Sequence, residues 1–147
     1  MIQDLNRKLS LFGIFCQIYV TVEKIIYDTI FPLRNKMEEN DIKSCFNYFY
    51  EIDETTIFNR GGTMKITGVA MSKATEKLLE FGWKQVPELG DVKKWVKCRN
   101  DLFHNGFVKF NDEHVNTNIE KMYDWYFNKF NGKDELLINI YKFYINE

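Results

Sequence analysis

The residues best suited to chemistry lie together in the short segment Arg99–His104. Histidine changes its protonation near neutral pH, so His104 can transfer protons as a general acid or base. Arg99 carries a permanent charge that can stabilise negative charge developing on a reacting group. Asn100 precedes His104 by four positions, and on a helix its amide could reach and orient the imidazole. Arg99, Asn100 and His104 therefore form the candidate catalytic set.

Arg99 falls near the middle of an apolar helix face, which is an unusual place for a charge. The segment Asp91–Asn105 shows helical periodicity, and at about 100° per residue one face collects Val92, Trp95, Val96, Leu102 and Phe103. Removing a guanidinium from water is costly unless a partner compensates. A purely structural role, in which Arg99 pairs with a buried carboxylate such as Glu23, Asp53 or Glu80, is the main alternative to catalysis.

The opposite stripe of this helix carries Lys93, Lys97, Asn100 and His104 within roughly 60° of one another. Two lysines on one stripe would attract a phosphate backbone, even though the formal net charge of the chain is −1. The competing interpretation is a solvated lysine face, with His104 complementing the helix dipole near its C-terminal end.

The string Arg99-Asn100-Asp101-Leu102-Phe103-His104 resembles the R-x4-H motif of HEPN domains, in the form with a polar residue directly after the arginine. HEPN proteins are small helical domains that carry this motif near the end of a late helix. Many members are metal-independent endoribonucleases of toxin–antitoxin, abortive-infection and CRISPR systems. The motif match covers six residues, and the helical layout agrees more loosely over most of the chain. The resemblance implies a toxin or antiviral-defence ribonuclease.

The resemblance also implies a mechanism and a quaternary structure. The 2′-hydroxyl of the RNA would be the nucleophile, so no metal or other cofactor is required. His104 would transfer protons, Arg99 would stabilise charge on the phosphoryl oxygens, and Asn100 would orient the imidazole, while Lys93 and Lys97 would bind the RNA. Residues five apart diverge by roughly 140° on an ideal helix. HEPN proteins resolve this divergence by dimerising, so a homodimer is expected, together with a cognate antitoxin or other regulatory protein.

Hydrophobic spacing predicts an all-α protein, a compact antiparallel bundle of about five to six helices. The expected helices are Ile2–Phe31, Glu39–Tyr50, Thr63–Phe81, Asp91–Asn105, Asp112–Phe130 and a short one ending at Tyr144. Thr63 and Asp91 are expected to be N-caps, Asp53–Gly62 a loop, and Asn105-Gly106 a helix stop. Strand-like alternation does not extend over a useful length, so no sheet is expected.

Length and composition indicate that residues 1–147 form a single domain of a cytoplasmic protein, and the resemblance implies that this domain is HEPN-like. Apolar residues make up 45% and aromatic residues 16%, which is enough for a core. The three cysteines show no CxxC spacing and indicate a reducing compartment rather than a zinc site. The apolar run Leu11–Val22 is too short to span a bilayer, and Asp4 argues against a signal peptide. No membrane association is expected.

Other enzyme classes lack their sequence signatures, because the chain has no metal-ligand spacing, P-loop, G-x-S-x-G or Rossmann glycine pattern. His114 lies outside any motif and is expected at the surface or in a cap. A C-terminal aromatic series is expected to form core and dimer interface rather than a base-stacking platform: Trp125, Tyr126, Phe127, Phe130, Tyr141, Phe143 and Tyr144. The alternative functions are a catalytically inactive HEPN-like module that binds RNA, a nucleotide or a protein partner, and a plain helical scaffold.

Overall fold

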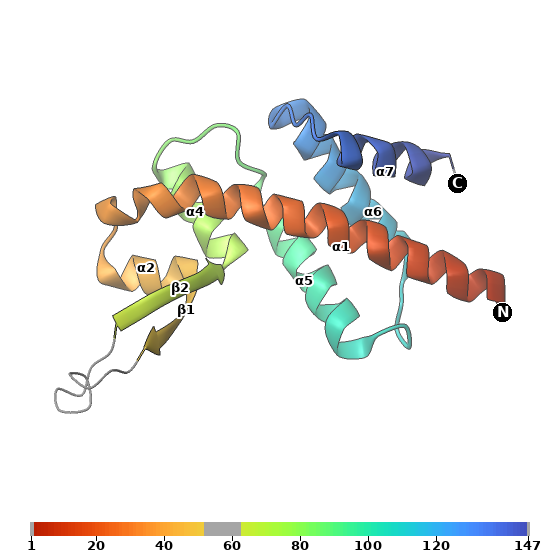
Figure 1. Ribbon diagram of the computed structural model, residues 1–147, viewed down its shortest axis with the longest axis horizontal. Helices are drawn as coiled ribbons and strands as arrows, with labels where there is room; N and C mark the ends of the chain where they lie inside the picture. Colours follow the sequence, from red (N-terminus) through yellow and green to blue (C-terminus); the bar gives the residue numbers. More distant parts are fainter. Residues whose placement is uncertain (1, 52–62, 147) are drawn as a thin grey trace.

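A long N-terminal helix is the central element of the computed structural model, which describes residues 2–51 and 63–146. This helix, α1 (Ile2–Ile30), runs along most of the molecule (Figure 1). Its apolar spacing buries one stripe, made of Leu11, Ile14, Phe15, Ile18, Tyr19, Val22, Ile26 and Ile30. Pro32 follows in the 3-10 turn η1 (Phe31–Lys36), where its missing N–H interrupts the helical hydrogen bonding. The prediction of the first helix is confirmed.

Four further helices pack against α1. They are α4 (Met71–Glu80), α5 (Leu89–Asn105), α6 (Asp112–Asp124) and α7 (Glu135–Ile145). In the shared core the largest side chains include Trp95 of α5, Tyr123 of α6 and Phe15 of α1, each at most 1% exposed. The structure is therefore mostly helical, as predicted, with a small two-stranded sheet that was not predicted.

The segment Ile2–Lys36 is long and apolar enough to cross a membrane by length and composition, with a mean hydropathy of 1.6 over 18 residues. The sequence prediction considered only the shorter run Leu11–Val22. In this window 39% of the residues are buried. The buried residues of α1 belong to the hydrophobic core. The core helix of a soluble protein and a signal sequence near the N-terminus both pass the same length and hydropathy test.

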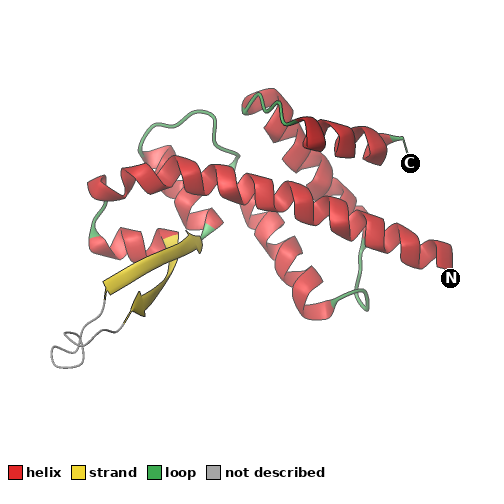
Figure 2. Ribbon diagram, in the orientation of Figure 1, coloured by secondary structure: helices red, strands yellow, loops and turns green. Residues whose placement is uncertain are grey.

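The second predicted helix is wrong beyond Cys45. The helix α2 (Glu39–Cys45) ends there, and the chain continues as strand β1 (Phe46–Glu51). This strand pairs antiparallel with β2 (Thr63–Val69), from Phe46 opposite Val69 to Glu51 opposite Thr63, with a bulge between Asn47 and Tyr48. Figure 2 shows the two strands as a hairpin at one end of the molecule. The aromatic side chains of β1 have high strand propensity, which explains the failure of the helical prediction.

The third predicted helix is wrong at its start. Thr63 begins β2 rather than capping a helix, and exposure alternates along the strand up to Gly68. The helix α4 begins only at Met71, after Ala70 donates its N–H to the carbonyl of Cys45 at 2.8 Å. The predicted loop Asp53–Gly62 lies outside the described residues.

The C-terminal half agrees with the predicted helices. Gly106 follows α5 at a φ of 57°, which favours glycine, and its N–H donates to the carbonyl of Leu102 at 3.0 Å. The N-cap of α5 is Glu88, three residues before the predicted cap Asp91, so the prediction for Asp91 is wrong and this residue lies in the first turn. The predicted helix Asp112–Phe130 is α6, continued by the π-helical turn η2 (Trp125–Lys129).

Candidate functional site

The orientation of α5 about its own axis is set by four buried side chains, Val92, Trp95, Cys98 and Leu102. These side chains pack into the core that α5 shares with α1 and α6. Because the helix cannot rotate without exposing them, the positions of the remaining α5 residues follow from helical geometry. The candidate residues of the motif are therefore held on a well-packed element.

Arg99 is half-buried on the side of α5 that faces α1. Its Cζ lies 4.2 Å from the ring centroid of Phe103, one turn further along α5. Its Nη1 donates a hydrogen bond to Oδ1 of Asn100 at 3.1 Å. A guanidinium over an aromatic face is stabilised by the ring quadrupole and retains N–H groups for other acceptors.

The charge of Arg99 is felt by side chains of α1. Burial raises the pKa of the Glu23 carboxyl and of the Cys16 thiol, and in both cases the positive charge of Arg99 opposes the shift. Burial likewise raises the pKa of Tyr19 to about 12, with Glu23 adding to the shift and Arg99 opposing it. These residues place the guanidinium beside one face of α1.

The predicted structural alternative for Arg99 is not observed within residues 2–51 and 63–146. Glu23 does not form an ion pair with Arg99 there, and Glu80 pairs instead with Lys77, at 3.1 Å between Nζ and Oε2. Asp53 lies outside the described residues. Arg99 thus has no described carboxylate within ion-pair distance, although its charge interacts with that of Glu23.

The predicted hydrogen bond between Asn100 and His104 is absent from the described structure. Asn100 instead accepts the bond from Arg99, its immediate neighbour. His104 lies in the last turn of α5 with its side chain exposed, where a cation would complement the helix dipole. The three motif residues are thus not assembled into one site by a single chain, since the only hydrogen bond described among them joins Arg99 and Asn100. The side chains of Arg99 and His104 leave α5 in different directions, as the helical wheel predicts, because both residues lie within the α-helix.

Lys93 and Lys97 are exposed on α5, as the helical wheel predicts. Neither forms an ion pair with a residue of the described ranges, so both ammonium groups face solvent. Lys97 also lines a cavity between α5 and α6 of about 250 Å³, together with Asp101, Lys109 and His114. The basic stripe is therefore continuous with a hollow in the surface.

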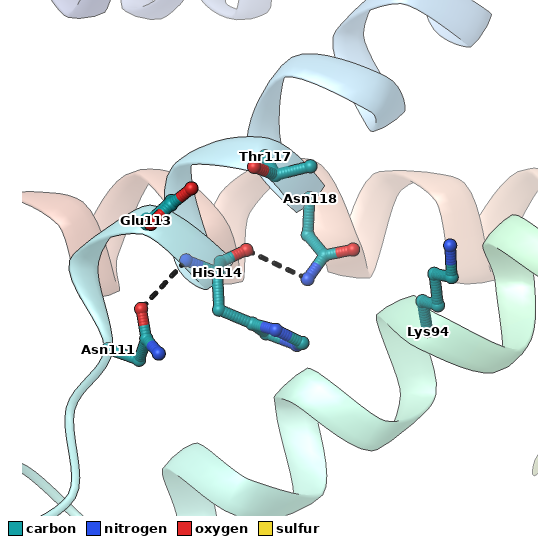
Figure 3. A pocket seen from close by; sticks show the side chains of 6 residues that line it. All are labelled: Lys94, Asn111, Glu113, His114, Thr117 and Asn118. Carbon is teal, nitrogen blue, oxygen red and sulfur yellow. Dashed lines mark hydrogen bonds between the residues drawn. The ribbon is translucent and has the colours of Figure 1, made fainter.

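His114 is the residue that the sequence interpretation undervalued. Its N–H donates to Oδ1 of the N-cap Asn111 at 3.0 Å, and its carbonyl accepts from Nδ2 of Asn118 at 2.9 Å (Figure 3). The imidazole points toward α5 and lines two neighbouring cavities. Its Nε2 is buried and has no hydrogen-bond partner among the described residues. Asn111 three positions earlier is the available signal, because an N-cap fixes which side chains of the first turn face the neighbouring helix.

Of the C-terminal aromatic series, two residues lie in the core and four pack against it partly buried, while the predicted dimer interface stays a prediction. Trp125 and Tyr126 are buried, and Trp125 Nε1 donates to the carbonyl of Gln85 at 2.9 Å. Tyr123 stacks on Phe127 at 5.7 Å between centroids. Phe143 is an exception, being more than half exposed.

The described ranges contain no group of three or more His, Cys, Asp or Glu side chains placed to hold a metal ion. The chemical groups available on α5 and α6 are therefore two imidazoles, one guanidinium and several unpaired ammonium groups. Groups of these types are able to bind a phosphate or to transfer a proton. Comparison with known protein families, curated protein sequences and solved structures found no match.

Proposed function

We propose that this chain is a metal-independent endoribonuclease of the HEPN type, which cleaves RNA as a homodimer. The observation that carries the proposal is the state of Arg99. Its guanidinium rests on Phe103, and no described carboxylate forms an ion pair with it. A partly exposed charge of this kind is available to a phosphate, whereas an arginine kept for a buried ion pair would not be.

The reaction follows from the chemistry of RNA and of these side chains. A base removes the proton of the 2′-hydroxyl, whose oxygen attacks the adjacent phosphorus. The bond from phosphorus to the 5′-oxygen breaks, and an acid protonates the leaving oxygen. His104 would act in these proton transfers, and Arg99 would stabilise the charge on the non-bridging oxygens. Asn100 would hold the guanidinium rather than the imidazole, which changes the role that the sequence predicted.

A dimer supplies the composite site in this proposal, with Arg99 of one chain beside His104 of the partner subunit. Beside Arg99 the surface of the described chain is rich in exposed apolar side chains. Phe103 is 54% exposed, and its ring lies 6.1 Å from that of Phe12 on α1. Leu5 and Leu9 share the face of α1 that carries Phe12, and each is about half exposed. Such a face would be covered by a second copy in an isologous interface.

Lys93 and Lys97 would hold the RNA strand through its phosphates in this mechanism. Their exposed, unpaired ammonium groups support this role, since phosphate contacts provide affinity without sequence preference. A toxin or antiviral-defence role in the cytoplasm, with a cognate antitoxin or other regulatory protein, completes the proposal.

One observation favours the catalytically inactive alternative. Asn100 bonds to Arg99, so within one chain the exposed imidazole of His104 lacks the partner that would orient it. A module that binds RNA or a nucleotide would need Arg99 and the lysines but not an oriented histidine. Product chemistry separates these two functions.

The test is incubation of the purified chain with a short RNA in excess EDTA, followed by mass spectrometry of the products. We expect cleavage to persist and to leave 2′,3′-cyclic phosphate or 2′-phosphate ends together with 5′-hydroxyl ends. A DNA oligonucleotide of the same sequence is the control, because it lacks the nucleophile and should stay intact. RNA binding without any cleavage would favour the inactive module, and a strict requirement for magnesium or manganese would exclude the proposed mechanism.

A further inference from the structure

A polar groove separates α5 from the first turns of α6. It consists of two adjoining cavities of about 320 and 250 Å³, which share Asn111 and His114. The larger cavity is lined by Lys94, Asn111, Glu113, His114, Thr117 and Asn118 (Figure 3). Lys97, Asp101 and Lys109 line the smaller one. We call this the α5–α6 groove; together its two cavities fall in the size range of small-ligand sites, about 300–1,000 Å³.

Three lysines around the groove, Lys94, Lys97 and Lys109, form no ion pair with residues of the described ranges. The groove differs in this respect from nearby surface, where the ammonium of Lys121 lies 4.0 Å from the carboxylate of Asp91. In a chain whose formal net charge is −1, three unpaired cations around one hollow form a local positive field. Such a field favours a ligand with concentrated negative charge, and phosphate is the common one.

The remaining lining groups suit a ligand with more than a phosphate. Glu113 and Asp101 bring carboxylates to the two cavities, and these groups accept hydrogen bonds from hydroxyls. Carboxylates would oppose the binding of a bare inorganic anion, but they are well suited to the hydroxyls of a ribose. Thr117 and the free Nδ2 of Asn111 add neutral hydrogen-bonding groups of the kind that recognise base edges.

His114 adds an imidazole to the lining of the groove at the point where the two cavities adjoin. Its ring lines both cavities, while its buried Nε2 has no partner among the described residues. A buried polar atom without a hydrogen bond lowers stability, and native proteins usually satisfy such an atom with protein, water or ligand. The cap at Asn111 fixes the backbone at His114 and therefore the side of α6 from which its ring projects.

We propose that the α5–α6 groove binds a nucleoside phosphate, with the phosphate held by Lys94, Lys97 and Lys109 and the ribose by the carboxylates. The bound molecule is either a free nucleotide or one nucleotide unit of an RNA strand, since both present the same groups. The groove lies on the α6 side of α5, whereas Arg99 faces α1. Binding there does not require cleavage at the motif.

The test is titration of the whole chain with AMP, ATP and a short RNA, read by calorimetry and by NMR of the histidine side chains. The sequence contains two histidines, so His104 and His114 give separate imidazole signals. We expect the His114 signal to shift on binding and the double variant Lys94→Ala/Lys109→Ala to weaken affinity by about tenfold or more. Lys142→Ala is the matched control, because Lys142 is exposed on α7 away from the groove.

The outcomes separate the two sources and keep this proposal apart from the proposed function. A response to AMP or ATP that the double variant weakens supports a free nucleotide, and a response to RNA alone supports a strand subsite. Both responses can be read in a His104→Ala background, where the proposed cleavage is removed. Equal affinity of the double variant and Lys142→Ala for all three probes, or an unmoved His114 signal, would overturn the site.

Discussion

At the scale of single residues, aromatic packing explains how Arg99 stays half-buried without an ion pair to a described carboxylate. Phe103 lies below the guanidinium, and Asn100 accepts one N–H group from its side. A cation over a ring contributes about 0.5–1 kcal/mol at an exposed site. This small contribution holds the side chain in position while leaving it free to bind an anion.

We expect His104→Ala to abolish RNA cleavage while leaving the helical circular dichroism spectrum and the free energy of unfolding almost unchanged. The imidazole is exposed at the end of α5 and packs little, whereas a general acid or base typically contributes about 10²–10⁴-fold in rate. Single-turnover cleavage rates provide the measurement, with Lys142→Ala as the control. If His104→Ala cleaves as fast as the parent, His104 has no catalytic role.

Arg99→Ala should also remove activity, but with a folding penalty of about 0.5–1 kcal/mol from the lost contact with Phe103. The penalty is small because the substitution breaks no ion pair with a described carboxylate and removes only a longer-range attraction to Glu23. Denaturant unfolding of the variant gives the value. A loss of about 3 kcal/mol or more would instead indicate a buried ion pair that the proposal excludes.

The buried thiol of Cys98 makes stability depend on alkaline pH. Burial raises its pKa from 9.0 to about 11, while a hydrogen bond with Asn118 opposes the shift. The folded chain therefore retains a proton that the unfolded chain loses between these values, so the free energy of unfolding falls as the pH rises from 9 toward 11. We expect the free energy of unfolding to fall less for Cys98→Ala than for the parent when denaturation is compared at pH values on either side of this window. An identical fall would show that Cys98 does not contribute.

At the scale of elements, the connection from η2 to α7 depends on one glycine. Gly132 donates its N–H to the carbonyl of Tyr126 at 2.8 Å, and the Tyr126 hydroxyl accepts from the N–H of Asp134 at 3.0 Å. A Cβ at position 132 would overlap the Tyr126 ring. The short turn before α7 therefore closes tightly around an aromatic side chain.

Gly132→Ala is expected to destabilise the fold by about 1–3 kcal/mol, because the ring or the turn must move. Gly13→Ala is the matched control, since position 13 is exposed in α1 and a Cβ there meets nothing within 4 Å. That variant should be stabilised by about 0.5–1 kcal/mol through helix propensity. Thermal unfolding of both variants tests this pair of predictions. An unchanged unfolding temperature for Gly132→Ala would mean that the turn before α7 accommodates a Cβ without cost.

At the scale of the whole molecule, the proposed composite site requires a dimer. We expect the chain to sediment as a dimer across the micromolar range and Leu9→Glu to shift it toward monomer, because a charge would be buried in the apolar face around Phe103. Leu136→Glu is the control, since Leu136 is similarly exposed but lies on α7. A parent chain that remains monomeric throughout this range would exclude the composite mechanism.

Mixing two inactive variants tests the same arrangement in a different way. A dimer of one Arg99→Ala chain and one His104→Ala chain retains a single site in which both residues are intact, if each site takes them from different chains. Activity should therefore return on mixing. Continued inactivity of a verified mixed dimer would show that each chain uses its own pair.

The features that the sequence determined by itself, such as helix ends and helix faces, depend on interactions between residues close together in the chain. The end of α5 at Gly106 depends on one glycine that adopts positive φ, and the start of α6 depends on the cap at Asn111. The periodicity of α5 likewise separates the lysine stripe from the face that carries Arg99. Signals of this kind involve residues within a few positions of each other, so they can be read without knowledge of the fold.

Contacts between distant segments decided the rest. The pairing of Phe46 with Val69 turned the end of one predicted helix and the start of another into strands, because a strand is stabilised by its partner more than by its own sequence. The periodicity of α5 could place Arg99 on the α1 face, but only the packing showed that the described carboxylates do not pair with it. His114 faces the α5–α6 groove because the buried residues of α6 dock against α5, and the spacing of the chain around position 114 does not contain that information.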